Sequence, residues 1–324
     1  MITLRRLGIV TLVLAFGQVV FGAIVRITGS GMGCGDHWPK CLGHWLPPLS
    51  RPDLIIEVTH RWIALALSIS VVALLILAWQ RRSLAGVGGP RGVLRPIALA
   101  AGLVVAAALL GAVVVKLDLH SYVVVAHLAI AMTLLATLVV AVIRAGGLGA
   151  ESAVPGSASA KTARGAMAAA GLAFAVLLLG ALTANVEGAA QACQGFPLCN
   201  GSIIPTTGGQ HIQVTHRVLA FLLFFHLIGL TIGTARRGEP GVVVRATRVA
   251  LAAVIVQIGI AAALVELFLP PMLQSMHQAV GSFVWIAIVA LTLLARQAAR
   301  PSGAPAARRL DDGDAIARTL EPAR

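Results

Sequence analysis

Charged residues are scarce in this chain of 324 residues, in which Asp, Glu, Lys and Arg make up only 11% and hydrophobic residues make up 58%. A soluble domain is about one quarter charged, so this composition excludes an ordinary soluble protein. Acidic residues are the scarcer sign, with 12 Asp and Glu against 25 Lys and Arg. These shortages indicate a polytopic membrane protein.

Aromatic residues are also few, at 5% of the chain with a single Tyr. The formal charge of +13 would suit a nucleic-acid partner, but the chain has no long basic helix and no aromatic residues interleaved with its basic ones. Its basic residues lie in short clusters between apolar runs, a pattern that orients helices in a membrane. We therefore expect a lipid bilayer as a partner and no nucleic acid.

Eight apolar stretches are long enough to cross a bilayer, which takes about 20 residues. Each is expected to be a helix, because lipid offers the backbone no hydrogen bonds. The first follows Met-Ile-Thr-Leu-Arg-Arg but is kept as a span, since it is longer than a signal peptide's apolar region and lacks a convincing cleavage site. The predicted spans are residues 7–26, 55–79, 95–116, 122–143, 165–186, 210–234, 243–266 and 272–295.

Lys and Arg are distributed unequally between the two sets of loops. The N-terminus, the even-numbered connections and the C-terminal tail hold 19 of the 25, and the other side holds 6. This excess predicts that both termini are cytoplasmic and that the loops on the other side, which hold all four cysteines, are extracytoplasmic. Residues 297–324, rich in Arg, Ala and Asp, are typical of a disordered tail, and residues 145–164 of a linker.

The chain repeats itself. The string Val-Thr-His-Arg occurs at 58–61 and again at 214–217, and a cysteine pair followed by Gly and Pro also occurs twice. The repeated features keep their order, which predicts a duplicated four-helix unit. We therefore expect an all-α membrane protein of two pseudo-symmetric four-helix bundles, residues 1–150 and 151–296. An even number of helices makes the repeat parallel, so the halves are related by an axis along the membrane normal.

Four of the nine histidines lie at repeat-related positions inside predicted spans: His60, His127, His216 and His277. Each lies about five residues from the outer end of its span, roughly 8 Å deep at 1.5 Å per residue. Two imidazoles that project inward at one depth from two parallel helices are arranged to hold a haem iron from both faces. Zinc would prefer further ligands, and copper finds no Met cluster beside them. Another metal, a proton relay and a structural role are the alternatives.

The remaining histidines suggest less. His226 has no histidine counterpart in the first half and fits a core or snorkelling residue. The others fall in or beside outer loops, where a solvated role is expected: His37, His44, His120 and His211.

The four cysteines form two closely spaced pairs, Cys34 with Cys41 and Cys193 with Cys199. Such spacing in an oxidising compartment suits a local disulfide, and the Gly and Pro around each pair suit a tight surface loop. A zinc site would need Cys-x₂-Cys spacing or more ligands. Two structural disulfides are the simpler interpretation, and a redox-active first pair is the alternative.

Glu57 is the main difference between the repeats, because its counterpart Gln213 cannot ionise. It precedes His60 by three residues, one turn nearer the surface on roughly the same helix face. An acid within a membrane span is a functional candidate, and the alternative is an ion pair with Arg61 in interfacial water. The difference suggests one half with a permanent haem and one that performs chemistry. Arg61 and Arg217 suit haem propionates, or are solvated interfacial residues.

The run from Gly22 to Gly31, followed by Cys34, Trp38-Pro39, Cys41, Gly43 and the Glu57/His60 motif, resembles the haem A synthase family over roughly residues 10–295. The resemblance implies oxidation of the C8 methyl group of haem O to the formyl group of haem A, for cytochrome oxidase assembly. It further implies a haem b cofactor held by His216 and His277, and substrate porphyrin held by His60 and His127. Glu57 would be the catalytic acid, which handles protons or stabilises a cationic intermediate.

Without the family resemblance, the residues predict only a duplicated membrane bundle that binds two haems. Such a bundle also suits a b-type cytochrome that takes electrons from quinol, or a haem carrier, and the Glu57/Gln213 difference favours an enzyme. The expected partners are haem O, the synthase that supplies it and an electron donor. The identity of that donor, the source of the oxygen atom and the oligomeric state, a homo-oligomer included, stay open.

Overall fold

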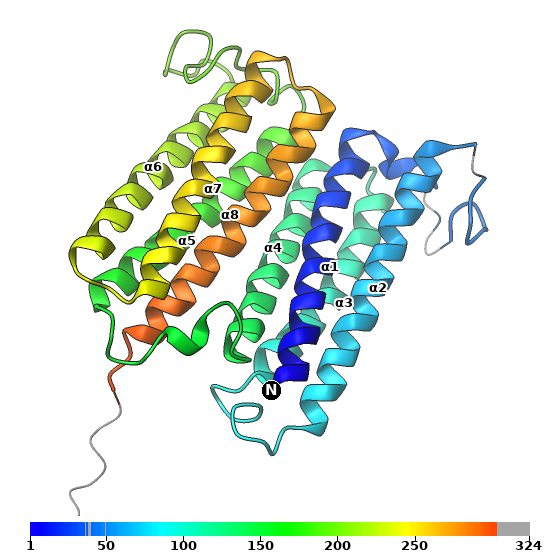
Figure 1. The fold of residues 1–324 in the computed structure, drawn as a ribbon. Helices are drawn as coiled ribbons and strands as arrows, with labels where there is room; N and C mark the ends of the chain where they lie inside the picture. Colours follow the sequence, from blue (N-terminus) through cyan, green and yellow to red (C-terminus); the bar gives the residue numbers. More distant parts are fainter. Residues whose placement is uncertain (36, 38–39, 49, 303–324) are drawn as a thin grey trace, which may run out of the picture.

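Eight long helices make up the computed structural model, which describes residues 1–35, 37, 40–48 and 50–302 (Figure 1). All eight are long and apolar enough to cross a membrane, so the prediction of an all-α, multi-pass membrane protein is confirmed. They are α1 (Ile2–Ile27), α2 (Pro52–Gln80), α3 (Leu94–Lys116), α4 (Ser121–Arg144), α5 (Ala160–Asn185), α6 (Gly208–Arg236), α7 (Gly241–Glu266) and α8 (Pro271–Ala298), with short 3₁₀ helices η1 (Ser30–Met32) and η2 (Ala150–Ser152).

The helices extend beyond the apolar runs from which they were predicted. Helix α1 begins five residues before the predicted start at 7, and α5 five residues before 165. Hydropathy finds only the apolar part of a helix, whereas the helix itself continues to its cap. In α5 that cap is Ser159, whose hydroxyl accepts a hydrogen bond from the backbone N–H of Thr162 (3.2 Å).

Two sequence predictions fall wholly or partly outside the described residues. Helix α8 ends at Ala298, so the predicted start of the tail at 297 is two residues too early. The predicted disorder of residues 303–324 lies outside the described part of the chain, as does the Trp38-Pro39 motif.

Each half of the chain is a ring of four helices. Consecutive helices pack together, and α1 closes against α4 as α5 closes against α8; the two rings meet where α1 and α4 contact α8 and where α4 contacts α5 (Figure 1). The repeat extends to the loops, because Leu42 and Asn200 both adopt left-handed backbone conformations, as do Leu119 and Leu269. The backbone therefore repeats as the sequence does.

Apolar packing holds the two rings together. Most residues in the second halves of α4 and α8 are buried, and Leu135 and Ile288 have no exposed surface. Trp285 of α8 donates its indole N–H to the carbonyl of Met132 in α4 (2.8 Å). By contrast, Phe225 is 62% exposed on the outer face of α6, where an apolar surface suits lipid.

The segment between the two rings is bonded to the helices on either side of it. It is shorter than the predicted linker, residues 145–164, because α5 begins at Ala160. Arg5 of α1 forms an ion pair with Glu151 (3.1 Å), and Gln297 donates to the carbonyl of Ala150 (2.9 Å). These contacts dock the connection onto α1 and α8.

Glu239 ties the start of α5 to the turn between α6 and α7. Its carboxylate accepts hydrogen bonds from the backbone N–H of Ser159 (3.0 Å), the hydroxyls of Ser159 and Thr162 (2.5 Å each) and Nε of Arg237 (3.2 Å). Burial raises the pKa of this carboxyl, but the four hydrogen bonds together outweigh burial and hold the pKa below its ordinary value of 4.5.

Replacing Glu239 by Ala should destabilise the protein by about 1–3 kcal/mol at neutral pH, because Ser159, Thr162 and Arg237 lose a buried acceptor. Since the folded-state pKa is the lower one, this stabilisation is present above 4.5 and is lost as the pH falls through the folded-state value. Thermal denaturation in detergent should therefore show a smaller difference between wild type and variant in acid. Glu187→Ala, which removes an exposed acidic side chain outside this network, is the control and should change little. A difference of the same size at both pH values would contradict this account.

Candidate functional site

The four repeat-related histidines lie in the first third of helices α2, α4, α6 and α8. His60 and His216 are each the ninth residue of their helices, and His127 and His277 are each the seventh. These helices begin one to three residues before the predicted spans, and the depth of the histidines below the membrane surface stays a prediction. His60 lies within electrostatic range of His127, and His277 of His216, so each ring of helices brings two imidazoles together.

A glycine on the preceding helix lies against three of the four imidazoles. A methyl group on Gly22 of α1 would come within 3.1 Å of His60 Nε2. One on Gly180 of α5 would come within 3.0 Å of His216 Cε1, and Gly111 of α3 faces the histidine of α4 in the same way. The missing side chains let these rings lie against the neighbouring helix, and any larger residue would have to displace them.

His60 has a side-chain partner in the first half. Gln18 of α1, one turn before Gly22, places its amide nitrogen 2.8 Å from His60 Nε2. An amide NH₂ group only donates hydrogen bonds, so Nε2 is the acceptor and the ring proton is on Nδ1. His60 therefore has its Nε2 lone pair engaged by Gln18.

His216 is held through its other nitrogen. Its Nδ1 lies 3.0 Å from the backbone carbonyl of Val176, one turn before Gly180 on α5. A carbonyl only accepts, so Nδ1 carries the proton and Nε2 keeps its lone pair. The fourth histidine, His277, contacts Gln257 of α7, whose amide nitrogen lies 3.1 Å from Nδ1 and 3.2 Å from Nε2.

Two imidazoles in each half suit a metal atom held from two opposite sides. Within the described residues no group of three or more His, Cys, Asp or Glu side chains could hold a metal, so the pairs do not suit zinc, which takes three or four such ligands. Three buried polar atoms beside the histidines have no hydrogen-bond partner in the described part of the chain: His127 Nδ1, Gln18 Oε1 and Gln257 Oε1. Such atoms are usually satisfied in a complete site. The donor set fits the iron of a porphyrin.

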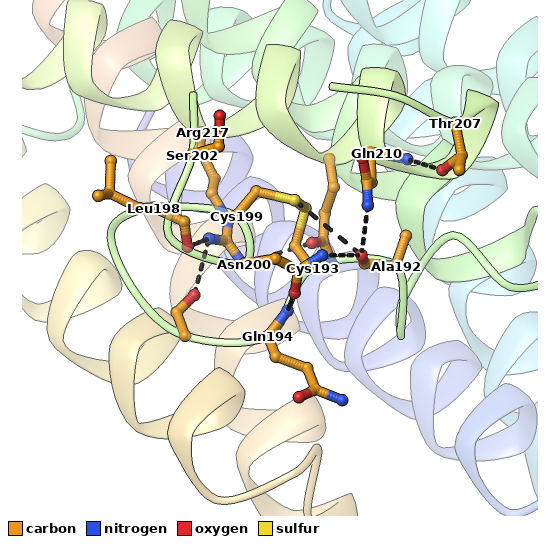
Figure 2. The surroundings of a disulfide bond; sticks show 12 residues. Ala192, Cys193, Gln194, Leu198, Cys199, Asn200, Ser202, Thr207, Gln210 and Arg217 are labelled. Atoms are coloured by element: carbon orange, nitrogen blue, oxygen red, sulfur yellow. Dashed lines mark hydrogen bonds between the residues drawn. A yellow bond between two sulfur atoms is a disulfide. The ribbon is translucent and has the colours of Figure 1, made fainter. Parts of the chain in front are cut away.

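Both cysteine pairs form disulfides, Cys34–Cys41 and Cys193–Cys199, with Cα–Cα distances of 4.7 and 4.5 Å. The predicted pairing is confirmed. Figure 2 shows how the second loop is held: the carbonyl of Ala192 accepts hydrogen bonds from the side chains of Asn200 (3.1 Å) and Gln210 (3.4 Å). The disulfide and the start of α6 are thus joined in one polar network.

Arg217 fastens the second disulfide loop to α6. Its guanidinium donates to the carbonyls of Gly195 (2.8 Å), Pro197 (3.2 Å) and Leu198 (2.7 Å), and to Gln213 (3.3 Å). Figure 2 draws Arg217 beside Leu198 in this loop. The loop's inward-facing carbonyls are satisfied by one buried cation.

Arg61 holds the first loop in the same manner, since it donates to the carbonyls of His37 (2.8 Å) and Lys40 (3.2 Å). The two arginines therefore fix the disulfide loops, a role that was not anticipated from the sequence. Their contact with haem propionates stays a prediction, and these hydrogen bonds favour the structural role.

Glu57 is buried, at 4% exposed, and both of its carboxylate oxygens have partners. Oε1 pairs with Arg61 (2.5 Å) and Oε2 accepts the backbone N–H of Cys34 (2.8 Å). The ion pair considered from the sequence is present, but it is buried beneath the loop instead of lying in interfacial water. Gln213 occupies the equivalent place and donates to the carbonyl of Ala190 (2.8 Å), so both residues fasten a loop and only Glu57 carries a charge.

Sequence reasoning missed Gln18 and Gln257, although a signal was present. Both are polar residues inside predicted spans, and the argument from burial cost that selected Glu57 applies to them. His226, unexplained by the sequence, has its Nε2 2.8 Å from the carbonyl of Gly165 and so joins α6 to α5. The outer-loop histidines are exposed as expected: His37, His44, His120 and His211.

A family model described as "Cytochrome oxidase assembly protein" matches residues 5–289. The chain belongs to this family. Three curated relatives named "Heme A synthase" are similar to it: one from Alkalihalophilus pseudofirmus is 31% identical over 238 residues (72% of this chain, 78% of the relative), one from Shouchella clausii 30% over 247 residues (72% and 76%), and one from Halalkalibacterium halodurans 31% over 241 residues (72% and 78%). The range that the family model matches includes every residue of the site, from Gln18 to His277.

Replacing Glu57 by Leu should loosen the first disulfide loop, because Arg61 and the N–H of Cys34 lose a buried acceptor. The reduction of Cys34–Cys41 by a mild reductant should then be about tenfold faster, the effect of losing one hydrogen bond to a charged group. Glu57→Gln keeps one acceptor oxygen of the two that the carboxylate offers, as Gln213 does for Arg217, and should give a rate between those of wild type and Glu57→Leu. Maleimide labelling and mass spectrometry measure the rate, with Cys193–Cys199 in the same sample as the control. Equal rates in Glu57→Leu and wild type would contradict this role.

Proposed function

We propose that this membrane protein is a haem A synthase, an oxidoreductase that converts the C8 methyl group of haem O into the formyl group of haem A. The observation that carries the proposal is the pair of imidazoles in each half of a chain of the cytochrome oxidase assembly family. The name of the relatives supports the same reaction. Haem O would reach the bilayer-embedded site from the synthase that makes it, and an electron donor would complete the set of partners.

We assign a haem b cofactor to the second half, residues 151–296, with His216 and His277 as its iron ligands. A metal-binding histidine usually donates its other ring N–H to a carbonyl, which fixes the ring and its tautomer. His216 already donates Nδ1–H to Val176 and keeps the Nε2 lone pair for iron. When bound there, a haem b supplies one-electron transfer to the reaction.

We assign substrate binding to the first half, residues 1–150, with His60 and His127 on either side of the porphyrin. His60 is held by the side chain of Gln18 through the same nitrogen that would bind iron, which suits a ligand that has to be exchanged. Gly22 and Gly111 leave room for each of these rings to lie against a neighbouring helix.

The role proposed for Glu57 is to place one negative charge beside the substrate half, a helical turn outward from His60. Its burial is offset by the ion pair with Arg61 and the hydrogen bond from Cys34. A charge held there stabilises positive charge that develops in the substrate, or takes up the proton that the oxidation releases. Gln213 carries no charge, so it can neither stabilise positive charge nor take up a proton. This agrees with a cofactor, and not a reacting substrate, in the second half.

The proposed orientation in the membrane follows from charge. The ends of the helices opposite the disulfides carry most of the Lys and Arg residues, so we place both termini in the cytoplasm and the cysteine loops outside. Disulfides persist in an oxidising compartment, which agrees with this placement. The haem sites then lie nearer the outer surface.

Expression of the chain in cells that make haem O tests the reaction. Extracted porphyrins should include haem A and its hydroxymethyl precursor, and Glu57→Gln should reduce their yield at least about tenfold, the effect expected for loss of a charged catalytic group. Retention of an intact first loop in that variant separates chemistry from folding. If the cells supply haem O and only haem B is recovered with the wild type, the synthase assignment is wrong, and a cytochrome or a haem carrier would account for the bundle.

The assignment of the halves is tested by the tightly held haem b spectrum. His216→Ala or His277→Ala should abolish it, because one axial ligand is lost, whereas His60→Ala and His127→Ala should leave it in place. Optical spectra of purified protein measure the effect. The opposite pattern would show that cofactor and substrate are assigned to the wrong halves.

A further inference from the structure

The two halves of the protein differ in how the first histidine of each pair is held. Gln18 and Val176 lie at equivalent positions, each one helical turn before the glycine that contacts the ring, Gly22 or Gly180. In the first half the side chain at this position donates to Nε2 of His60, whereas in the second half only the backbone carbonyl is used, and it binds Nδ1 of His216. One substitution in a duplicated unit therefore changes which ring nitrogen is engaged.

The consequence follows from the chemistry of imidazole. Neutral imidazole has one N–H and one lone pair, and the lone pair binds either a hydrogen-bond donor or a metal. The Gln18 amide N–H uses the lone pair of His60 on Nε2. Val176 has no side-chain donor, so the lone pair of His216 has no such competitor on α5.

We propose that Gln18 is a positioning residue that competes with the substrate's iron for His60 and so keeps the first half exchangeable; this inference rests on the proposed function. Binding of haem O breaks the hydrogen bond between the Gln18 amide and Nε2 and forms a bond between Nε2 and iron. The proton stays on Nδ1, and no electron is transferred. On release of the product the amide takes back the lone pair, so Nε2 of the half-buried His60 ring always has a partner.

This competition serves an enzyme whose product is a haem. Haem A has to leave the first half after each reaction, whereas a cofactor has to stay in the second half. A ligand whose release leaves a buried, unpartnered nitrogen dissociates slowly, because that nitrogen is desolvated without compensation. Gln18 removes that penalty at His60, whereas its counterpart Val176 offers His216 no side-chain donor; in the second half the Gln257 amide contacts the other histidine, His277.

The test measures release of haem O from the full-length protein, loaded with ferric haem O in detergent and mixed with excess apomyoglobin. Gln18→Val, which copies the second half, should slow release about 5- to 10-fold, the effect of one hydrogen bond. Gln18→Leu, of nearly the same volume as Gln, should do the same. Unchanged or faster release in both variants would overturn the proposal, since Gln18 would then be a packing residue or a direct contact of the porphyrin.

The reciprocal variants examine the second half. Val176→Gln gives His216 a competing donor and should speed the release of haem b about fivefold, the effect of one hydrogen bond, whereas Val176→Leu controls for added volume. Equal effects of Gln and Leu would count against competition. A wild type that binds no haem O would overturn the proposed function of the first half, and faster haem b release in Val176→Gln alone would still support competition for the ring nitrogen.

Discussion

Lipid cannot hydrogen-bond to a polar group, and this constraint governs every polar contact within the helices of this protein. Each imidazole, amide or guanidinium placed on a membrane helix needs a partner from another helix or a loop. The constraint explains why Gln18 forms a hydrogen bond with His60 and why His226 forms one with the carbonyl of Gly165. It also explains why Arg217 donates hydrogen bonds to three loop carbonyls. Much of the site is assembled from side chains that bond to one another across helix contacts, while His127 Nδ1 and the amide oxygens of Gln18 and Gln257 have no partner in the described part of the chain.

The duplicated unit places two histidines in each half, and small differences between the copies agree with the different uses proposed for them. The packing of each ring, the disulfide loop and the glycine against the imidazole are common to both halves. The differences are confined to a few side chains, chiefly Glu57 in place of Gln213 and Gln18 in place of Val176. A charge near one pair of histidines and an amide donor to one of them are differences that would suit the proposed separation of a substrate site from a cofactor site.

The outer loops are joined to α2 and α6 by residues that lie beside His60 and His216 in the sequence. Glu57 and Arg61 lie within four residues of His60, and they hold Cys34 and the loop carbonyls. Arg217, directly after His216, holds the other loop. The loops are thus bonded directly to the first turns of α2 and α6, close to His60 and His216. A buried ion pair in this place is best understood as fixing geometry, since its desolvation cost offsets much of its attraction.

The sequence by itself determined the eight spans, the duplication, the two disulfides and the recurring histidines, because hydropathy, repeat spacing and cysteine pairing are properties of the linear chain. It placed the helix starts of α1 and α5 too late, since a helix extends through polar turns that hydropathy does not count. Only the tertiary structure decided that Glu57 lies beneath the first loop, that Arg61 and Arg217 donate to loop carbonyls, and that His60 and His216 are held by opposite nitrogens. The physical reason is that a partner is chosen by which helices pack together and by how each ring is turned, and neither is fixed by spacing along the chain.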